Sequence, residues 1–139
     1  MTGVVTAHHA AILGLLQAGS PSFTVYDGQV PDQPSFPYAV LYGDTGIDDG
    51  TKLCGNPDLA TFRFQVTSVG LTAASALVVV DQTRERVLGI RPAVAGWSLN
   101  RIRKETSLPV REDRDVTDTA THRHPLYGVD TYVFESRKD

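Results

Sequence analysis

Two histidine pairs have the residue type that metal chemistry uses most often. His8 and His9 are adjacent, and His122 and His124 flank Arg123. Four imidazoles brought together could hold an ion, for which two histidines at i and i+4 of a helix are the favourable arrangement. Adjacent residues point to different sides of a helix, so His8 and His9 cannot easily share one ion. The sequence favours solvated or half-packed histidines, and we assign no metal and no cofactor.

Acid–base chemistry has one candidate group, which lies in the segment 106–126. Asp118, His122 and His124 occur there, and a loop that carries them could close over a substrate as the lid of a small hydrolase. No serine lies in a nucleophile-elbow sequence. Cys54, the one cysteine, has only Lys52 near it to activate a thiolate. We therefore assign no catalytic residue.

Acidic residues gather in the segment 44–58 without forming a known ligand pattern. Asp44, Asp48 and Asp49 lack the one-three-five spacing and the closing glutamate of a calcium loop. The glycines of this segment are those of turns and do not form a phosphate loop. A solvated acidic loop between strands is the better interpretation.

Charge is unevenly distributed along the chain. Thirteen basic and sixteen acidic residues leave a net charge of −3, so the whole molecule lacks the basic footprint of a nucleic-acid binder. Residues 27–58 carry six aspartates against one lysine, whereas residues 84–104 carry five arginines and one lysine against one glutamate. Two ordinary solvated faces would explain this, but complementary patches that meet between copies of the chain would also do so. The candidate interface residues are Asp44, Asp48, Asp49, Arg84, Arg101, Arg103, Lys104, Arg111 and Arg114.

Hydrophobic periodicity predicts the elements that must position these residues. Helical spacing predicts helices over 2–18 and 72–88, the second capped by Thr72. Alternation and β-branched or aromatic content predict strands over 23–26, 38–42, 60–68, 97–105 with a bulge, and 127–135. Residues 44–58 and 106–126 are expected to be loops. No apolar run approaches the length needed to span a bilayer, and no secretory signal begins the chain, so we expect no membrane association.

The order of these elements predicts an α+β fold in one domain over residues 1–139. Only one connection between neighbouring strands contains a helix, which favours a mostly antiparallel sheet of four to five strands. The two helices are expected to pack on one face of the sheet, with a long charged loop before the last strand.

Short motifs in the same order resemble a known family. They are Val-Tyr-Asp-Gly at 25–28 followed by Val-Pro at 30–31, Pro-Tyr-Ala-Val-Leu-Tyr at 37–42, Phe-Arg-Phe-Gln-Val-Thr-Ser-Val-Gly at 62–70, Asp-Gln-Thr-Arg at 81–84, and Tyr-Gly-Val-Asp-Thr-Tyr-Val-Phe at 127–134. Together these motifs resemble the small tail terminator, or tail completion, proteins of long-tailed bacteriophages. The motifs consist of hydrophobic pattern and turn residues, so another protein of the head-tail junction could share them.

The resemblance implies a structural role in a virion rather than catalysis. Such proteins form a ring, usually of six copies, that caps the tail tube, stops its polymerisation and offers the surface that docks to the head. The expected partners are further copies of the chain, the tail tube protein and a head completion or connector protein, while DNA passes through the lumen without specific binding. The loops 44–58 and 106–126 are then candidates to order against the tube or a neighbour. The alternatives are another head-tail junction protein, a small hydrolase, or a module that binds a peptide at a sheet edge.

Overall fold

The structure is a computed structural model of the chain and describes residues 3–48 and 59–139. This part contains two helices and seven strands, which confirms the α+β class. In chain order they are α1 (Val4–Gln17), β1 (Thr24–Asp27), β2 (Tyr38–Gly43), β3 (Ile47–Asp48), β4 (Leu59–Gly70), α2 (Ala73–Val87), β5 (Trp97–Leu99), β6 (Arg103–Glu112) and β7 (Leu126–Lys138). Neither helix is long and apolar enough to cross a membrane.

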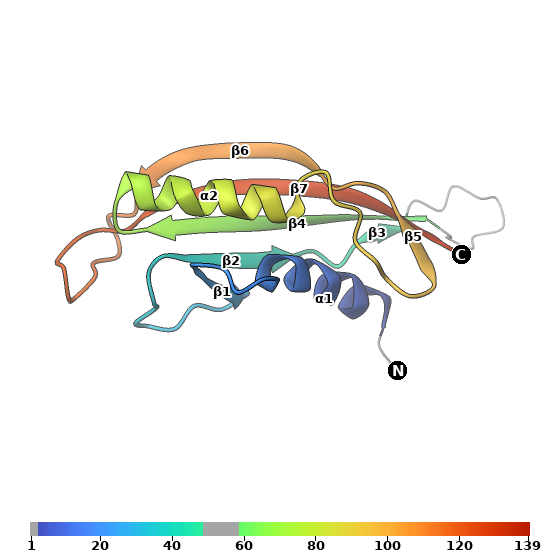
Figure 1. Cartoon of the computed structure of the whole chain (residues 1–139), viewed down its shortest axis with the longest axis horizontal. Coiled ribbons are helices and arrows are strands. Elements are labelled where there is room, and N and C mark those ends of the chain that lie inside the picture. The colour runs from blue at the N-terminus through green and yellow to red at the C-terminus, as the bar shows by residue number, and fades with distance from the viewer. Residues whose placement is uncertain (1–2, 49–58) are drawn as a thin grey trace.

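The strands form one sheet around two long central members (Figure 1). The order is β1-β2-β4-β7-β5, with β3 beside β4 and β6 beside β7. β1 and β2 run parallel, from Thr24 opposite Tyr38 to Asp27 opposite Leu41, and the other pairs are antiparallel. The sheet is thus mixed, and it has more strands than the four to five that the sequence predicts.

Each helix follows from a local signal in the sequence. On α1, His8, Ile12 and Leu16 are the buried residues, spaced four apart on one side. The predicted cap of α2 is confirmed, because the Thr72 hydroxyl accepts a hydrogen bond from the backbone N of Ser75 at 3.1 Å. α2 is helical although it contains three consecutive valines, which are better strand formers.

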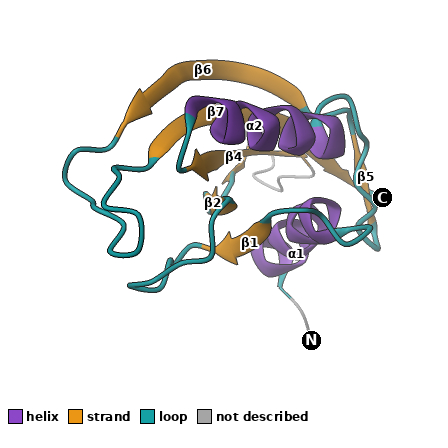
Figure 2. Ribbon diagram, turned by 60° about the vertical axis from the view of Figure 1, so that its left-hand side comes forward, coloured by secondary structure: helices purple, strands orange, loops and turns teal. Residues whose placement is uncertain are grey.

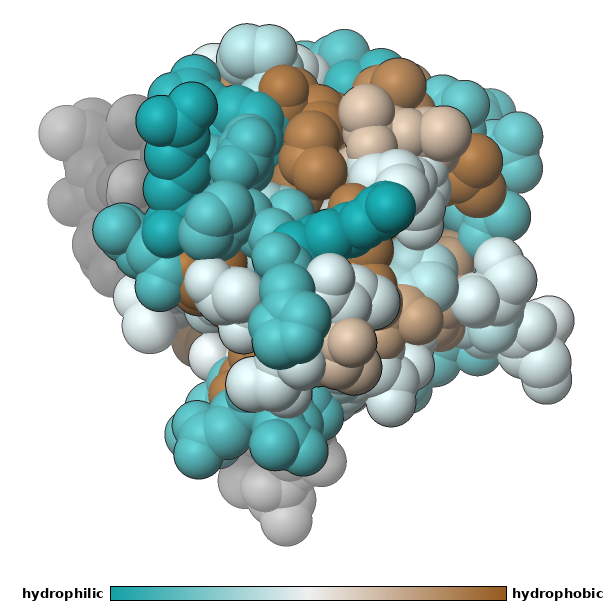
Figure 3. All heavy atoms as spheres, turned by 90° about the vertical axis from the view of Figure 1, so that its left-hand side faces the viewer, coloured by the Kyte–Doolittle hydropathy of each residue, from teal (hydrophilic) through white to brown (hydrophobic). Residues whose placement is uncertain are grey.

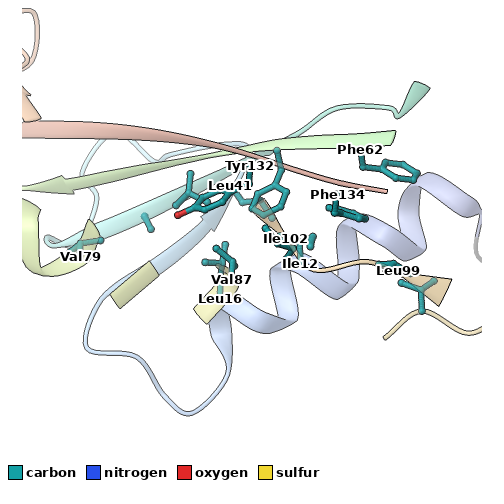
Figure 4. Close-up of a cluster of buried hydrophobic side chains, with 14 of the residues drawn as sticks. Ile12, Leu16, Leu41, Phe62, Val79, Val87, Leu99, Ile102, Tyr132 and Phe134 are labelled. Atoms are coloured by element: carbon teal, nitrogen blue, oxygen red, sulfur yellow. The ribbon is translucent and has the colours of Figure 1, made fainter. Parts of the chain in front are cut away.

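The core lies between the helices and one face of the sheet (Figures 2 and 4). Phe62 lies opposite Phe134, and Phe64 lies opposite Tyr132, in the β4–β7 register. These two ring pairs are stacked, with centroids 5.5 and 5.1 Å apart. Both helices contribute to the cluster, through Ile12 and Leu16 of α1 and Val79 and Val87 of α2. Each such buried side chain stabilises the fold by about 1.5–3 kcal/mol before the entropy cost.

His8 is part of this core rather than a solvated group. It is 1% exposed, and its ring stacks on Phe62 with centroids 4.4 Å apart. Nδ1 donates to the carbonyl of Val4 at 2.7 Å, and Nε2 accepts from the Ser136 hydroxyl at 2.6 Å. Burial lowers the pKa of His8 below its ordinary value, although the Val4 carbonyl opposes this. Both ring nitrogens are occupied, so His8 acts as a packed neutral imidazole.

Within residues 3–48 and 59–139, no helix covers the opposite face of the sheet, which we call the open face. Its side chains alternate along each strand with those of the core. Val40, Val69 and Val133 are buried there, while Tyr42 and Leu108 are 43% and 52% exposed. This face therefore combines apolar side chains with access to solvent.

The prediction of a loop over 106–126 is wrong for residues 106–112, which form part of a strand. Residues up to Glu112 belong to β6, which pairs with β7 from Arg103 opposite Val133 to Glu112 opposite Leu126. Nine of the ten β6 residues are exposed, because β6 has a partner on one side only and little covers it. An edge strand of this kind lacks apolar alternation, and charges and a proline on it discourage pairing with other chains. Only residues 113–125 form a loop.

Two other predicted boundaries also differ from the structure. The single strand expected over 97–105 is interrupted, because Asn100 turns its side chain to the backbone N of Glu135 at 2.8 Å and Ile102 enters the core. The loop expected over 44–58 contains the short strand β3. Residues 49–58, with Asp49 and Cys54, lie outside the described residues.

Gly70 provides a test of how closely β4 approaches α2. A Cβ placed there would lie 2.6 Å from the backbone N of Ala76, so the backbone would have to move. We expect Gly70→Ala to lower the free energy of unfolding by about 1–3 kcal/mol. Gly14→Ala is the matched control, because a Cβ at this position would meet no atom within 4 Å beyond the neighbouring backbone of its own helix. It should raise this free energy by about 0.5–1 kcal/mol. Urea denaturation measures both, and similar effects would contradict the close approach.

Candidate functional site

Arg84 is the candidate interface residue that the structure places in an internal network. Its Nε and Nη2 atoms donate to the two carboxylate oxygens of Asp130 at 2.8 and 3.0 Å. The Ser107 hydroxyl donates to the same carboxylate at 2.6 Å. The side chain of Arg84 is 34% exposed and that of Asp130 only 6%. This network joins α2, β6 and β7, and it balances much of the Arg84 charge within the chain.

Asp130 is ionised despite its burial. Desolvation raises the pKa of a carboxyl group, but hydrogen bonds from Arg84 and Ser107 outweigh it and hold the pKa of Asp130 below its ordinary value. The Tyr132 hydroxyl donates to Asp130 at 3.4 Å, and burial, together with the Asp130 charge, raises the pKa of Tyr132. The buried carboxylate is thus surrounded by donors, which is the condition for retaining a charge in a protein interior.

The other candidate basic residues near β6 are accessible. Arg101 donates to the carbonyl of Gly89 at 2.9 Å, and Arg103 pairs with Glu135 at 3.1 Å. Lys104 is exposed and makes no ion pair within the described part of the chain. Exposed pairs contribute little to stability, so these cations remain available to another molecule. Consecutive positions of a strand place Arg103 on the open face and Lys104 on the other.

The predicted acidic patch is only partly described. The Asp44 carboxylate accepts hydrogen bonds from the backbone N atoms of Gly46 and Arg63, both at 3.1 Å, and thereby holds the turn after β2. Asp48 lies in β3, but its side chain and the whole of Asp49 lie outside the described residues. The pairing of acidic and basic patches between copies remains a prediction.

Arg111 and Arg114 lie at the far end of β6 and in the loop 113–125. Arg111 is exposed and lies opposite Tyr127, on the open face. The Arg114 side chain is 85% exposed, with Nε 4.0 Å from a carboxylate oxygen of Glu112. Both guanidinium groups can therefore reach another molecule.

A groove on the open face is the feature that sequence reasoning missed. It has a volume of about 240 Å³ and lies between the loops 28–37 and 113–125. Its lining comprises Val30, Tyr38, Val40, Tyr42, Thr67, Val69, Asp113, Val116, Pro125 and Tyr127. Figure 3 views the end of the molecule where these loops lie and shows apolar side chains in brown among polar ones in teal. The alternation of residue types within 38–42 and 127–134 indicates that the second face of the sheet also carries apolar side chains. The sequence does not show that the tyrosines of these two segments meet, because this depends on the pairing of the strands.

The acid–base candidates of the loop 113–125 make local contacts. Asp118 accepts from the backbone N and the hydroxyl of Thr121 at 3.0 and 2.6 Å. His124 Nδ1 lies 2.7 Å from the Val116 carbonyl, and the backbone N of His122 donates to the Asp118 carbonyl. These bonds shape the loop. Across residues 3–48 and 59–139, no three His, Cys, Asp or Glu side chains are grouped as a metal site would need.

The Arg84–Asp130 network yields a stability prediction. We expect Asp130→Asn to lower the free energy of unfolding at neutral pH by about 2 kcal/mol, since it removes charge-assisted hydrogen bonds to a partly exposed arginine. Asp81→Asn, which removes the charge of an exposed acid on α2, should change it by less than about 0.5 kcal/mol. Because the pKa of Asp130 is lowered in the fold, its contribution is complete above the ordinary value of 3.8 and is lost as the pH falls further.

The measurement is urea denaturation of both variants and the unchanged chain at neutral pH and below pH 3.8. The difference between Asp130→Asn and the unchanged chain should shrink in acid. A difference that stays constant would show that the carboxylate is not the group that the network stabilises.

Comparisons with known proteins relate the chain to others by fold. No family model matches it, and a search of curated proteins finds no match. Among solved structures, a chain from the virion of a native gene transfer agent (GTA) particle aligns with 99% of this chain and 98% of its own length, with a TM-score of 0.66 and 19% identity. A second solved chain aligns with 92% of this chain and 90% of its own, at 16% identity and a TM-score of 0.48, too low to carry an argument. The chain therefore has, from end to end, a fold similar to that of a chain in the GTA virion.

Proposed function

We propose that this protein is a structural component of a phage-like virion, and that its place is the head-proximal end of the tail. There it acts as a tail terminator: copies form a ring, of six by the family resemblance, that caps the tail tube and ends its polymerisation. The exposed side of the ring docks to a head completion or connector protein. The protein acts through its surfaces and breaks no bond.

The observation that carries this proposal is the end-to-end likeness to a chain of the GTA virion. The alignment covers nearly all of both chains, so it concerns the whole domain rather than a shared helix–sheet fragment. Fold similarity at 19% identity does not transfer a role by itself. It agrees, however, with the resemblance of the motifs at 25–42, 62–70 and 127–134 to tail terminators.

The sheet edges offer a way to build a ring. β6 lies at one edge and is exposed along nearly all of its length, while β1 lies at the other. A head-to-tail contact joins two different surfaces of one chain and closes into a ring when the rotation allows. The basic residues Arg101, Arg103 and Lys104 lie at the start of the β6 edge, and Arg111 and Arg114 at its end. We assign these residues to the interface, opposite the acidic segment that includes Asp44, Asp48 and Asp49.

A head completion or connector protein is the second candidate function, because likeness to a chain of the GTA virion does not specify a position within the particle. The two roles differ in what happens to the tail. A terminator limits the length of the tube, whereas a connector retains DNA in the head.

Particles assembled without this chain distinguish these roles. We expect electron microscopy to show tubes longer than normal and unattached to heads, because nothing stops the addition of tube rings. The control is the same preparation with the chain restored from a plasmid. Tails of normal length together with heads that have lost their DNA would support the connector. Complete, infectious particles would overturn both.

The charged interface can be tested by its dependence on salt. Arg101→Glu with Arg103→Glu should weaken self-association more at about 0.01 M than at about 1 M ionic strength, because the Debye length falls from about 30 to 3 Å. Arg137→Glu with Lys138→Glu is the matched control, since both residues are exposed, lie on β7 and give the same change of charge. Sedimentation measures self-association of the free chain. If the free chain is monomeric, co-sedimentation with tail tubes measures its assembly on the tube. Equal losses at both ionic strengths would show that packing closes the ring.

A further inference from the structure

The groove on the open face holds tyrosines contributed by β2 and β7. Val69 of β4 lies opposite Tyr38 of β2 on one side and opposite Tyr127 of β7 on the other. The two tyrosines therefore flank Val69 in a line that crosses the three strands. Tyr42 lies further along β2 and is 43% exposed. The Tyr38 ring is held by Tyr26 and Phe36, with centroids 5.4 and 5.3 Å away. At Tyr38 the groove thus presents an aromatic surface held in place by two other rings.

Asp113 adds a carboxylate without a cation to this groove. Its Oδ1 accepts from the backbone N of Asp115 at 3.2 Å, and its own backbone N donates to the Pro125 carbonyl at 2.8 Å. Within residues 3–48 and 59–139 no basic side chain forms an ion pair with it, although the exposed Arg111 at the end of β6 lies two residues before it in the chain. Burial raises the pKa of Tyr38 most, and the neighbouring Tyr42, Tyr26 and, last, Asp113 raise it further. The carboxylate therefore lies beside the tyrosine rings, and no ion pair among the described residues occupies it.

The remaining lining is apolar except for Thr67. Val40 and Val69 are 2% and 5% exposed, and Val30 and Val116 belong to the two flanking loops. A side chain that fits this groove needs an apolar stem, a flat cationic end and hydrogen-bond donors. Arginine has all three: its methylene chain packs on apolar surface, its guanidinium stacks on aromatic rings, and its donors match a carboxylate. Lysine lacks the flat group that stacks.

We propose that this groove is a docking site for an arginine side chain on an extended segment of another polypeptide. The guanidinium stacks on the tyrosines and donates to Asp113, and the arginine stem packs on the accessible side chains of Val30 and Val116. The charge of Asp113 selects a basic segment over a neutral or acidic one. This docking site does not depend on the tail-terminator assignment, because it rests on the contacts of the groove alone.

The test is an NMR titration of the whole chain with capped tripeptides. The probe has arginine between two valines, and the comparison probes have citrulline, lysine or glutamate in the centre. The arginine probe should shift the resonances of Tyr38, Val69 and Tyr127 in a saturable manner. The citrulline probe, which keeps the shape without the charge, should bind about tenfold more weakly. Equal binding of the arginine and citrulline probes, or shifts outside the groove only, would overturn the proposal.

Two variants assign the effect to the groove. Asp113→Asn keeps an oxygen for the Asp115 backbone N and removes the charge, so it should weaken the arginine probe about tenfold. Asp115→Asn is the matched control, since Asp115 is exposed and does not line the groove, and it should change the affinity less than about twofold. Tyr42→Ala should also weaken binding, by about fivefold, through loss of a ring. Equal losses in Asp113→Asn and Asp115→Asn would show that general electrostatic attraction, not the groove, binds the probe.

Discussion

The antiparallel ladder between β4 and β7 is the constraint on which the other elements depend. It runs from Leu59 opposite Arg137 to Gly70 opposite Leu126 and forms the centre of the sheet. Because side chains alternate between the faces of a strand, a slip by one residue would move Phe62 and Phe64 from the core to the open face. The same register brings Asp130 within reach of α2 and β6. The core, the Arg84–Asp130 ion pair and the groove therefore all depend on the pairing of β4 with β7.

The two faces of this ladder meet different surroundings. On one face the stacked rings of Phe62 and Phe134 are covered by helices, and His8 completes the packing with both ring nitrogens bonded. On the other face Val40 and Val69 are shielded only by neighbouring strands and by two loops. When helices cover only one face of a sheet, apolar side chains on the other face are usually shielded by loops or by a binding partner. The open face is thus where a partner would gain most from contact.

Sequence patterns predicted the structure correctly where a residue's environment is determined by its neighbours in the chain. The alternation over 60–68 and the Thr72 cap are local signals, and both describe the structure correctly. β6 beyond Glu105 was predicted as a loop, because an uncovered edge strand has no apolar face to reveal it. The Arg84–Asp130 pair joins residues 46 positions apart, and the groove tyrosines come from different strands. A local sequence pattern does not show which distant residues come into contact. The sequence therefore predicted the charged residues of the candidate site but not their partners.

The structure also shows why counting charges along the chain overstates a patch. Arg84 is balanced by Asp130, while Arg103 and Arg63 have glutamate partners on the open face. Groups whose charge is already compensated add little long-range field, and exposed pairs are screened further by salt. What remains is smaller and more localised: uncompensated cations along β6, and the carboxylate of Asp113 beside the groove. Opposite charges left at separate places on one chain favour contact between different surfaces, which is the geometry that a head-to-tail assembly requires.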